Sequence, residues 1–68
     1  MAIRLSPNII GKKVRIIRGY GPWRPGMVGE VVRYGAARIR GGVVWVNVEG
    51  IVPGQGQHYA ENLEGYNE

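Results

Sequence analysis

The sequence predicts an all-β fold, a small barrel of about five short strands with one short helical turn. Twelve glycines and four prolines among 68 residues supply turns at short intervals along the chain. Valine and isoleucine outnumber leucine, and β-branched side chains favour strands over helices. Apolar and polar residues alternate over short stretches, which is the pattern of strands with one buried face.

Each predicted element follows from this alternation and from the turn residues between the stretches. The predicted strands span residues 12–18, 27–34, 43–49, 55–59 and 64–67, with the helical turn over 60–63. Residues 1–10 form a lead-in. A chain of 68 residues is long enough for one domain, so we expect residues 1–68 to form a single domain. Two complete sheets would need a longer chain, which favours a barrel over a sandwich.

Side-chain alternation also predicts which residues form the core. Val14 and Ile16 share one face of the first strand. In the third strand the valines at 44, 46 and 48 share a face that we expect to be buried, which leaves Trp45 on the outer side. Gly29, inside the second strand, predicts a bend or a close backbone approach, which is a common way to curve a small barrel.

The chain has few of the usual means of reinforcing a small domain. A chain of this size buries only about 60% of the surface that its unfolded form exposes. It contains no cysteine, which excludes disulfides, thiolate catalysis and cysteine-ligated metal sites. His58, the single histidine, has no carboxylates clustered near it in sequence, so we expect no metal site. Oligomerisation remains, and a homo-oligomer is an open alternative.

The start of the chain and its apolar runs predict where the protein resides. The first residues lack the apolar core of a signal peptide. The longest apolar run, residues 43–46, is far shorter than the roughly 20 residues that span a bilayer. We therefore expect a soluble, cytoplasmic protein with no membrane partner.

No catalytic pattern is found. The chain has no aspartate and no cysteine, and no carboxylate near His58 in sequence could orient it as a general base. The glycine-rich residues 50–56 lack the Lys-Ser/Thr of a phosphate-binding loop. We expect no catalytic residue and no cofactor, and hence a non-catalytic binding module.

The charge distribution predicts an anionic partner. All nine lysines and arginines lie in residues 1–40 with one carboxylate, Glu30, whereas residues 41–68 carry four glutamates and no cation. This asymmetry predicts an anion-binding surface, with nucleic acid as the expected partner and an acidic protein surface as the alternative. A merely solvated surface also fits the pattern. The candidate contacts are Lys12, Lys13, Arg15, Arg18, Arg24, Arg38 and Arg40.

Two tryptophans and one polar strand complete the candidate sites. We expect Trp23, in a proline-flanked loop, and Trp45 to be stacking anchors beside the arginines. A tryptophan lid over the open end of the barrel is the alternative. In residues 55–59, His58 alternates away from Gln57 and Tyr59, so these polar groups could bind a ligand or form a solvated edge strand.

Residues 11–19 and 26–32 resemble the KOW motif of ribosomal and transcription-factor SH3-like domains. The motif opens at Gly11, alternates valines, turns at glycine and resumes with Gly-x-Val. The resemblance implies an SH3-like barrel that binds RNA or protein. The loop between the two segments is longer than is usual in that family, with extra residues around 22–25, so no binding residue is carried over there.

A second resemblance is to the small stromal-side accessory subunit of photosystem I. It implies a protein-docking subunit of a larger complex with no catalysis of its own. The similar residues are Lys13-Val14-Arg15-Ile16, Trp23, Val28-Gly29, Val43-Val44 and Tyr59-Ala60-Glu61.

A third resemblance is to the plasmid-borne type B dihydrofolate reductases. It implies a homotetramer that reduces dihydrofolate with NADPH in a shared central pore, lined by Gln57 and Tyr59 with His58 between them. The chain departs from that family at Gly56, where the family has valine, and at Ile16 or Ile17, where it has a substrate-steering lysine. The similar residues are Gly11, Val14-Arg15, Trp23, Val28-Gly29, Pro53-Gly54-x-x-Gln57-x-Tyr59 and Leu63-Glu64.

Overall fold

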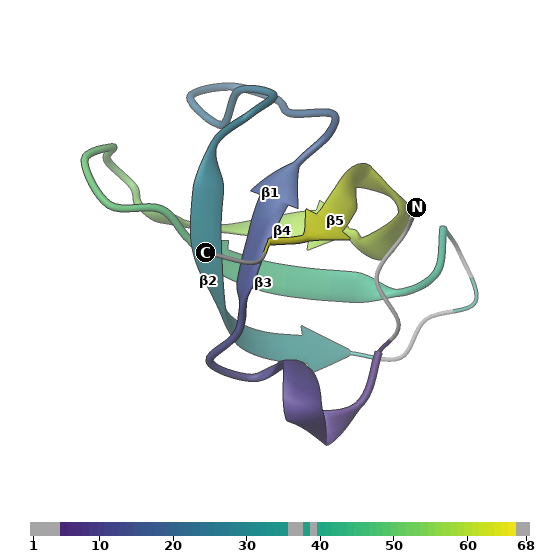
Figure 1. Ribbon diagram of the computed structural model, residues 1–68. Helices are drawn as coiled ribbons and strands as arrows, with labels where there is room; N and C mark the ends of the chain where they lie inside the picture. The colour runs from purple at the N-terminus through teal and green to yellow at the C-terminus, as the bar shows by residue number, and fades with distance from the viewer. Residues whose placement is uncertain (1–4, 36–37, 39, 67–68) are drawn as a thin grey trace.

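The computed structural model describes residues 5–35, 38 and 40–66, which form one antiparallel sheet of five strands (Figure 1). The order of the strands in the sheet is β4-β3-β2-β1-β5. The all-β prediction is confirmed. The strands are β1 (Lys13–Ile16), β2 (Val28–Gly35), β3 (Val43–Asn47), β4 (Gln55–Tyr59) and β5 (Leu63–Gly65), and two 3-10 turns are η1 (Pro7–Ile9) and η2 (Ala60–Asn62).

The sheet curls into a small barrel-like fold because β2 pairs with two different partners along its length. The first half of β2 pairs with β1 and the second half with β3, and the register shifts at a bulge between Val31 and Arg33. A bulge increases the local twist, which turns the second half of the strand away from the first. At the other end of the chain, η2 connects β4 at one edge of the sheet to β5 at the opposite edge.

The interior is filled by the residues that the alternation predicted. Val14 and Ile16 are buried, as are the valines at 44, 46 and 48. Val31, Ala60 and Leu63 complete this apolar cluster, and Trp23 joins it from the loop between β1 and β2. Small branched side chains therefore supply most of the core of this barrel.

The strand ends differ from the prediction because loop hydrogen bonds replace strand pairing there. β1 ends at Ile16, since the amides of Ile17 and Arg18 donate to the carbonyl oxygen of Asn62. β3 ends at Asn47, because the next amide, that of Val48, closes a loop onto Gly54 O at 2.9 Å. β5 begins at Leu63, directly after η2, rather than at residue 64, and residue 67 of its predicted span lies outside the described residues.

Among the described residues, the helical content is two short turns rather than the one that was predicted. Residues 7–9, predicted as part of a lead-in, form the turn η1, in which the amide of Ile10 donates to Pro7 O at 3.4 Å. Pro7 suits the first position of such a turn because its ring fixes φ and it has no amide hydrogen to leave unpaired. In the part of the chain that the structure describes, no helix has the length and apolar character needed to cross a membrane.

Gly29 makes the close approach that its place in the strand predicted. A Cβ atom at Gly29 would lie 2.5 Å from Val46 Cγ1 and 2.8 Å from the carbonyl oxygen of Asn47. The absence of a side chain therefore lets β2 pass directly over β3.

We predict that Gly29→Ala lowers the free energy of unfolding by about 1–3 kcal/mol, because the added methyl group overpacks this crossing. Gly65→Ala is the matched control, since a Cβ at Gly65 in β5 meets no atom within 4 Å. We expect that control to change stability by less than about 0.5 kcal/mol. Urea unfolding of both variants measures the difference, and equal midpoints would contradict the packing at Gly29.

Candidate functional site

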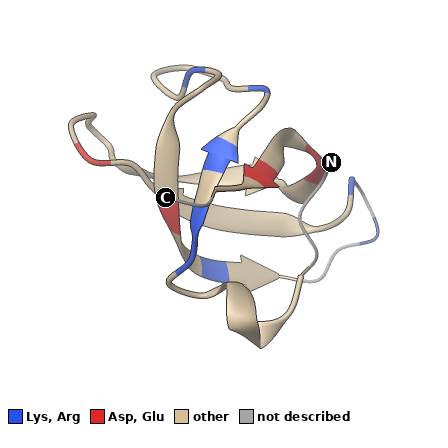
Figure 2. Cartoon of the chain, in the orientation of Figure 1, with Lys and Arg blue, Asp and Glu red and all other residues tan. Residues whose placement is uncertain are grey.

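The cations predicted to bind an anion are all exposed, but they are spread over several parts of the barrel. Figure 2 shows Lys and Arg in the loop between β1 and β2, along β1, and in the segment between β2 and β3. Some of the seven face carboxylates: Arg15 Nη2 lies 2.6 Å from Glu64 Oε1 on the neighbouring strand, and Arg40 lies near Glu61. The seven are Lys12, Lys13, Arg15, Arg18, Arg24, Arg38 and Arg40.

The pairing of β3 with β4 creates a continuous outer face. Residues directly opposite each other in an antiparallel pair point to the same side of the sheet. The intervening Val44, Val46 and His58 are buried inside the barrel. We call the six outward residues the β3–β4 outer face; they are Val43 opposite Tyr59, Trp45 opposite Gln57, and Asn47 opposite Gln55.

Two arginines lie over the two aromatic rings of this face. Arg33, opposite Trp45 on β2, places its guanidinium carbon 4.5 Å from the centroid of the Trp45 ring. Arg40, in the turn before β3, places its guanidinium carbon 5.0 Å from the centroid of the Tyr59 ring. Both distances are typical of cation–π contacts. On this face, therefore, each of the two aromatic rings has a guanidinium group stacked on it.

This face contains only part of the set that the sequence predicted. Trp45 and Arg40 were predicted as anion or stacking contacts, and Trp45 does lie on the outer side. Tyr59 and Gln57 were predicted as polar groups of a ligand-binding or solvated edge strand and, from the reductase resemblance, as pore-lining residues. Arg33 belongs to the basic set of residues 1–40 but was not among the predicted contacts, and its position opposite Trp45 depends on the β2 bulge, which shifts the pairing after Val31.

The Arg40 side chain is exposed and only weakly paired with a carboxylate. Its Nε lies 4.0 Å from Glu61 Oε1, and the two side chains are 55% and 44% exposed. Exposed ion pairs of this kind contribute about 0–1 kcal/mol. A phosphate could therefore displace Glu61 from Arg40 at little cost.

Trp23 is buried, and the prediction that it is an exposed stacking anchor is wrong. It is 7% exposed, and its indole Nε1 donates a hydrogen bond of 3.3 Å to Gly54 O. The amide of Trp23 also donates to Tyr20 O, which folds the loop back onto the barrel. Trp23 instead belongs to the buried apolar cluster. The ring fits because Gly56 has no side chain; a Cβ there would overlap the indole.

A groove follows the edge strand β4 and adjoins the outer face. It has a volume of about 550 Å³. The Tyr20 hydroxyl donates to the backbone oxygen of Gln57 beside it, so the β1–β2 loop is attached to the strand at this point. We call this the β4-edge groove; it is lined by Gly19, Tyr20, Arg40, Val43, Gln57, His58, Tyr59 and Asn62.

His58 lines this groove from the inner side of β4 and is 3% exposed. Its ring centroid lies 5.2 Å from that of Tyr20 and 5.5 Å from that of Trp23. Within the residues that the structure describes, neither Nδ1 nor Nε2 has a hydrogen-bond partner. Burial lowers the pKa of His58, because an apolar environment disfavours the charged imidazolium.

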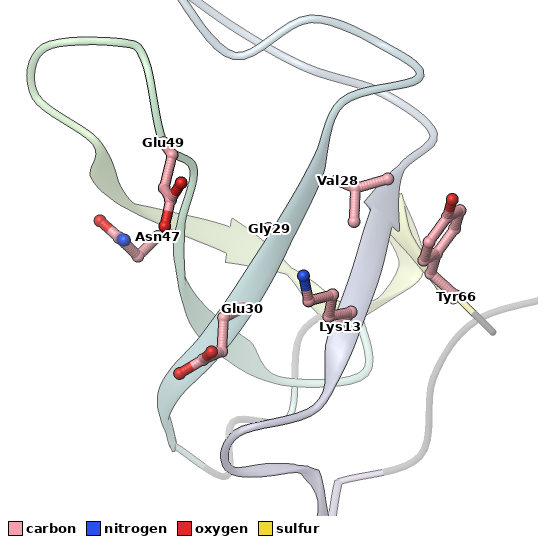
Figure 3. Close-up of a pocket in the computed structure, with 7 residues that line it drawn as sticks. All are labelled: Lys13, Val28, Gly29, Glu30, Asn47, Glu49 and Tyr66. Atoms are coloured by element: carbon pink, nitrogen blue, oxygen red, sulfur yellow. The ribbon is translucent and has the colours of Figure 1, made fainter. Parts of the chain in front are cut away.

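A second pocket, of about 530 Å³, lies over the crossing of β1, β2 and β3 (Figure 3). It combines Lys13, one of the predicted anion contacts, with Glu30 and Glu49. Glu30 is the cross-strand partner of Lys13, so positive and negative charge lie close together here. This mixture is less suited to a polyanion than the outer face is. Among the described residues, no group of three histidine, cysteine or acidic side chains could hold a metal ion.

Comparison with known proteins gives no further guide, because no protein-family model, curated protein or solved structure matches this chain.

We predict that the free energy of unfolding falls as the pH is lowered from 6.5, the ordinary pKa of histidine. The pKa of His58 in the folded protein lies below that value, so the unfolded chain takes up this proton at a higher pH than the folded chain does. Below pH 6.5 protonation therefore favours unfolding, until the pH falls past the lowered pKa. Well above pH 6.5, His58 is neutral in both the folded and the unfolded chain, so it adds no pH dependence to the free energy of unfolding.

His58→Phe provides the control, because phenylalanine keeps a ring against Tyr20 and Trp23 and does not titrate. Urea unfolding between about pH 8 and pH 5.5, above the range where glutamates titrate, compares the two proteins. We expect the free energy of unfolding of the native chain to decrease as the pH falls, which gives a slope against pH, and that of the variant to show no slope. Identical slopes would show that His58 is not the group responsible.

Proposed function

We propose that this protein is a non-catalytic binding module that holds single-stranded nucleic acid on the β3–β4 outer face. The observation that supports this most directly is the pair of cation–π contacts, Arg33 over Trp45 and Arg40 over Tyr59, on one accessible side of the sheet. Exposed bases stack on aromatic rings and on guanidinium planes, and arginine also binds phosphate. Both requirements are met by side chains on the same surface.

The geometry of the sheet supports binding of more than one nucleotide. Tyr59 is two residues beyond Gln57, which lies opposite Trp45. Such diagonal neighbours in an antiparallel pair are about 7–8 Å apart. The two residues are therefore near neighbours on the face, so successive bases of one strand can reach both of them.

The remaining groups of the face favour binding that tolerates different sequences. Asn47, Gln55 and Gln57 carry amides that donate and accept hydrogen bonds, so they can adapt to different bases. A formal net charge of +4 attracts a polyanion over the whole surface. The lack of cysteine agrees with a reducing cytoplasm, where we place this activity.

We predict that Trp45→Ala raises the Kd for a labelled single-stranded oligonucleotide about tenfold, because one stacked base contributes about 1–3 kcal/mol. Arg33→Ala should weaken binding and make the dependence of Kd on salt less steep, since one phosphate contact is lost. Fluorescence anisotropy at about 50 mM and about 200 mM salt measures both effects.

The matched control is Arg24→Ala, which removes the same charge from an exposed position in the β1–β2 loop. We expect its Kd to change less than twofold. If Arg24→Ala and Arg33→Ala have equal effects, binding depends on overall charge rather than on this face. If no oligonucleotide binds at about 50 mM salt, the proposal is wrong.

One observation also favours the reductase-like alternative: Gln57 and Tyr59 are both exposed on the same side of β4, as residues that line a pore must be. That function requires four subunits around the pore, with NADPH and dihydrofolate bound between them. We predict a monomer of 7.5 kDa in solution, measured by light scattering. A tetramer of four such chains would favour the pore instead, and an assay of dihydrofolate reduction would then test the reaction.

The alternative of a docking subunit in a larger complex is separated from nucleic-acid binding by nuclease treatment. A stoichiometric protein partner that remains bound after nuclease treatment would favour docking.

A further inference from the structure

We propose, on the basis of the proposed function, that the β4-edge groove takes one base of the bound strand and that His58 contacts the polar edge of that base. Three features of the groove support this inference: its aromatic and amide lining, the unpaired imidazole at its inner side, and the way in which Tyr20 covers that imidazole.

The lining matches a flat ring with polar edges. Tyr20 and Tyr59 contribute aromatic surfaces, and Gln57 and Asn62 contribute amides. An apolar ligand would leave these amides unpaired, whereas a base can both stack and form hydrogen bonds. Arg40 belongs to the groove and also stacks on Tyr59, so its guanidinium can bind the phosphate attached to the inserted base.

His58 is the feature that packing alone does not explain. It is 97% buried, yet neither ring nitrogen has a partner among the described residues. Buried polar groups in native proteins are nearly always hydrogen-bonded, and a phenylalanine would fill the same space without that cost. A neutral imidazole offers one donor and one acceptor, which is the combination that the edge of a base can pair with.

Tyr20 separates this imidazole from solvent and is the side chain that must move. It is 51% exposed, and its ring lies over His58 with the centroids 5.2 Å apart. Its hydroxyl bond to the Gln57 backbone oxygen is the polar contact that fixes the side chain. The Trp23 ring contacts Tyr20, with the centroids 5.0 Å apart, but it is also held by its hydrogen bond to Gly54 and by its fit against Gly56. Tyr20 can therefore turn outward and leave the core intact, which opens His58 to the groove.

The test follows the imidazole directly. Nitrogen-15 NMR of the single histidine is recorded at about pH 7.5 with homopolymers of each of the four bases and with a base-free oligonucleotide of equal length. We expect the base-containing strands to shift the His58 ring nitrogens by an amount that depends on the base, and the base-free strand to leave them unchanged. Trp45→Ala should weaken binding but preserve the imidazole shift at saturation.

His58→Phe supplies the second measurement. It keeps the ring contacts with Tyr20 and Trp23, so we expect it to fold at least as stably as the native chain. Its affinity for the base-free strand should match that of the native protein within twofold. We expect the native protein to show at least a fivefold spread of Kd among the four homopolymers, and the variant less than a twofold spread.

The possible failures are distinguishable. If the homopolymers bind, but the imidazole signals do not move and His58→Phe keeps the spread, the groove inference is overturned and the outer-face proposal is unaffected. If no oligonucleotide binds, the proposed function fails, and titration with the four nucleoside monophosphates tests the groove on its own. A base-dependent imidazole shift in that titration would support the groove, and unchanged signals would overturn it.

Discussion

The register in which β4 pairs with β3 determines which side chains of these two strands lie on the β3–β4 outer face and which lie in the core. With Trp45 opposite Gln57 and Val44 opposite His58, the rings and amides point outward and the imidazole points inward. A slip of one residue would reverse this arrangement, because side chains alternate between the two faces of a strand. Gln57 and Tyr59 would then enter the core, and the valines of β3 fix the register against such a slip by being buried.

Two glycines make that arrangement possible because they have no side chain where neighbouring atoms lie very close. Gly29 lets β2 pass over Val46 and Asn47, and Gly56 leaves room for the indole of Trp23. Trp23 then packs in the core and anchors the β1–β2 loop, from which Tyr20 reaches β4. The core and the β4-edge groove therefore both depend on the β1–β2 loop: Trp23 of this loop packs in the core, and Tyr20 lines the groove.

Local arrangement, more than total charge, distinguishes the proposed binding face. Cations are found on most parts of the barrel, and one of them, Arg15, is paired with Glu64. Arg33 and Arg40 each lie over an aromatic ring on the β3–β4 outer face. Charge alone would attract any polyanion, whereas a cation beside a flat ring selects partners that also present exposed bases.

The sequence by itself determined the fold class, the core positions on the first and third strands, the close approach at Gly29 and the outward placement of Trp45. These features depend on local patterns, namely period-two alternation, turn residues and β-propensity, which act over a few residues. The tertiary structure decided the burial of Trp23, the pairing of Arg33 with Trp45 and the enclosure of His58 by Tyr20. Each of these contacts joins segments that are far apart in the chain or depends on a bulge, and neither the strand register nor a bulge can be derived from alternation alone.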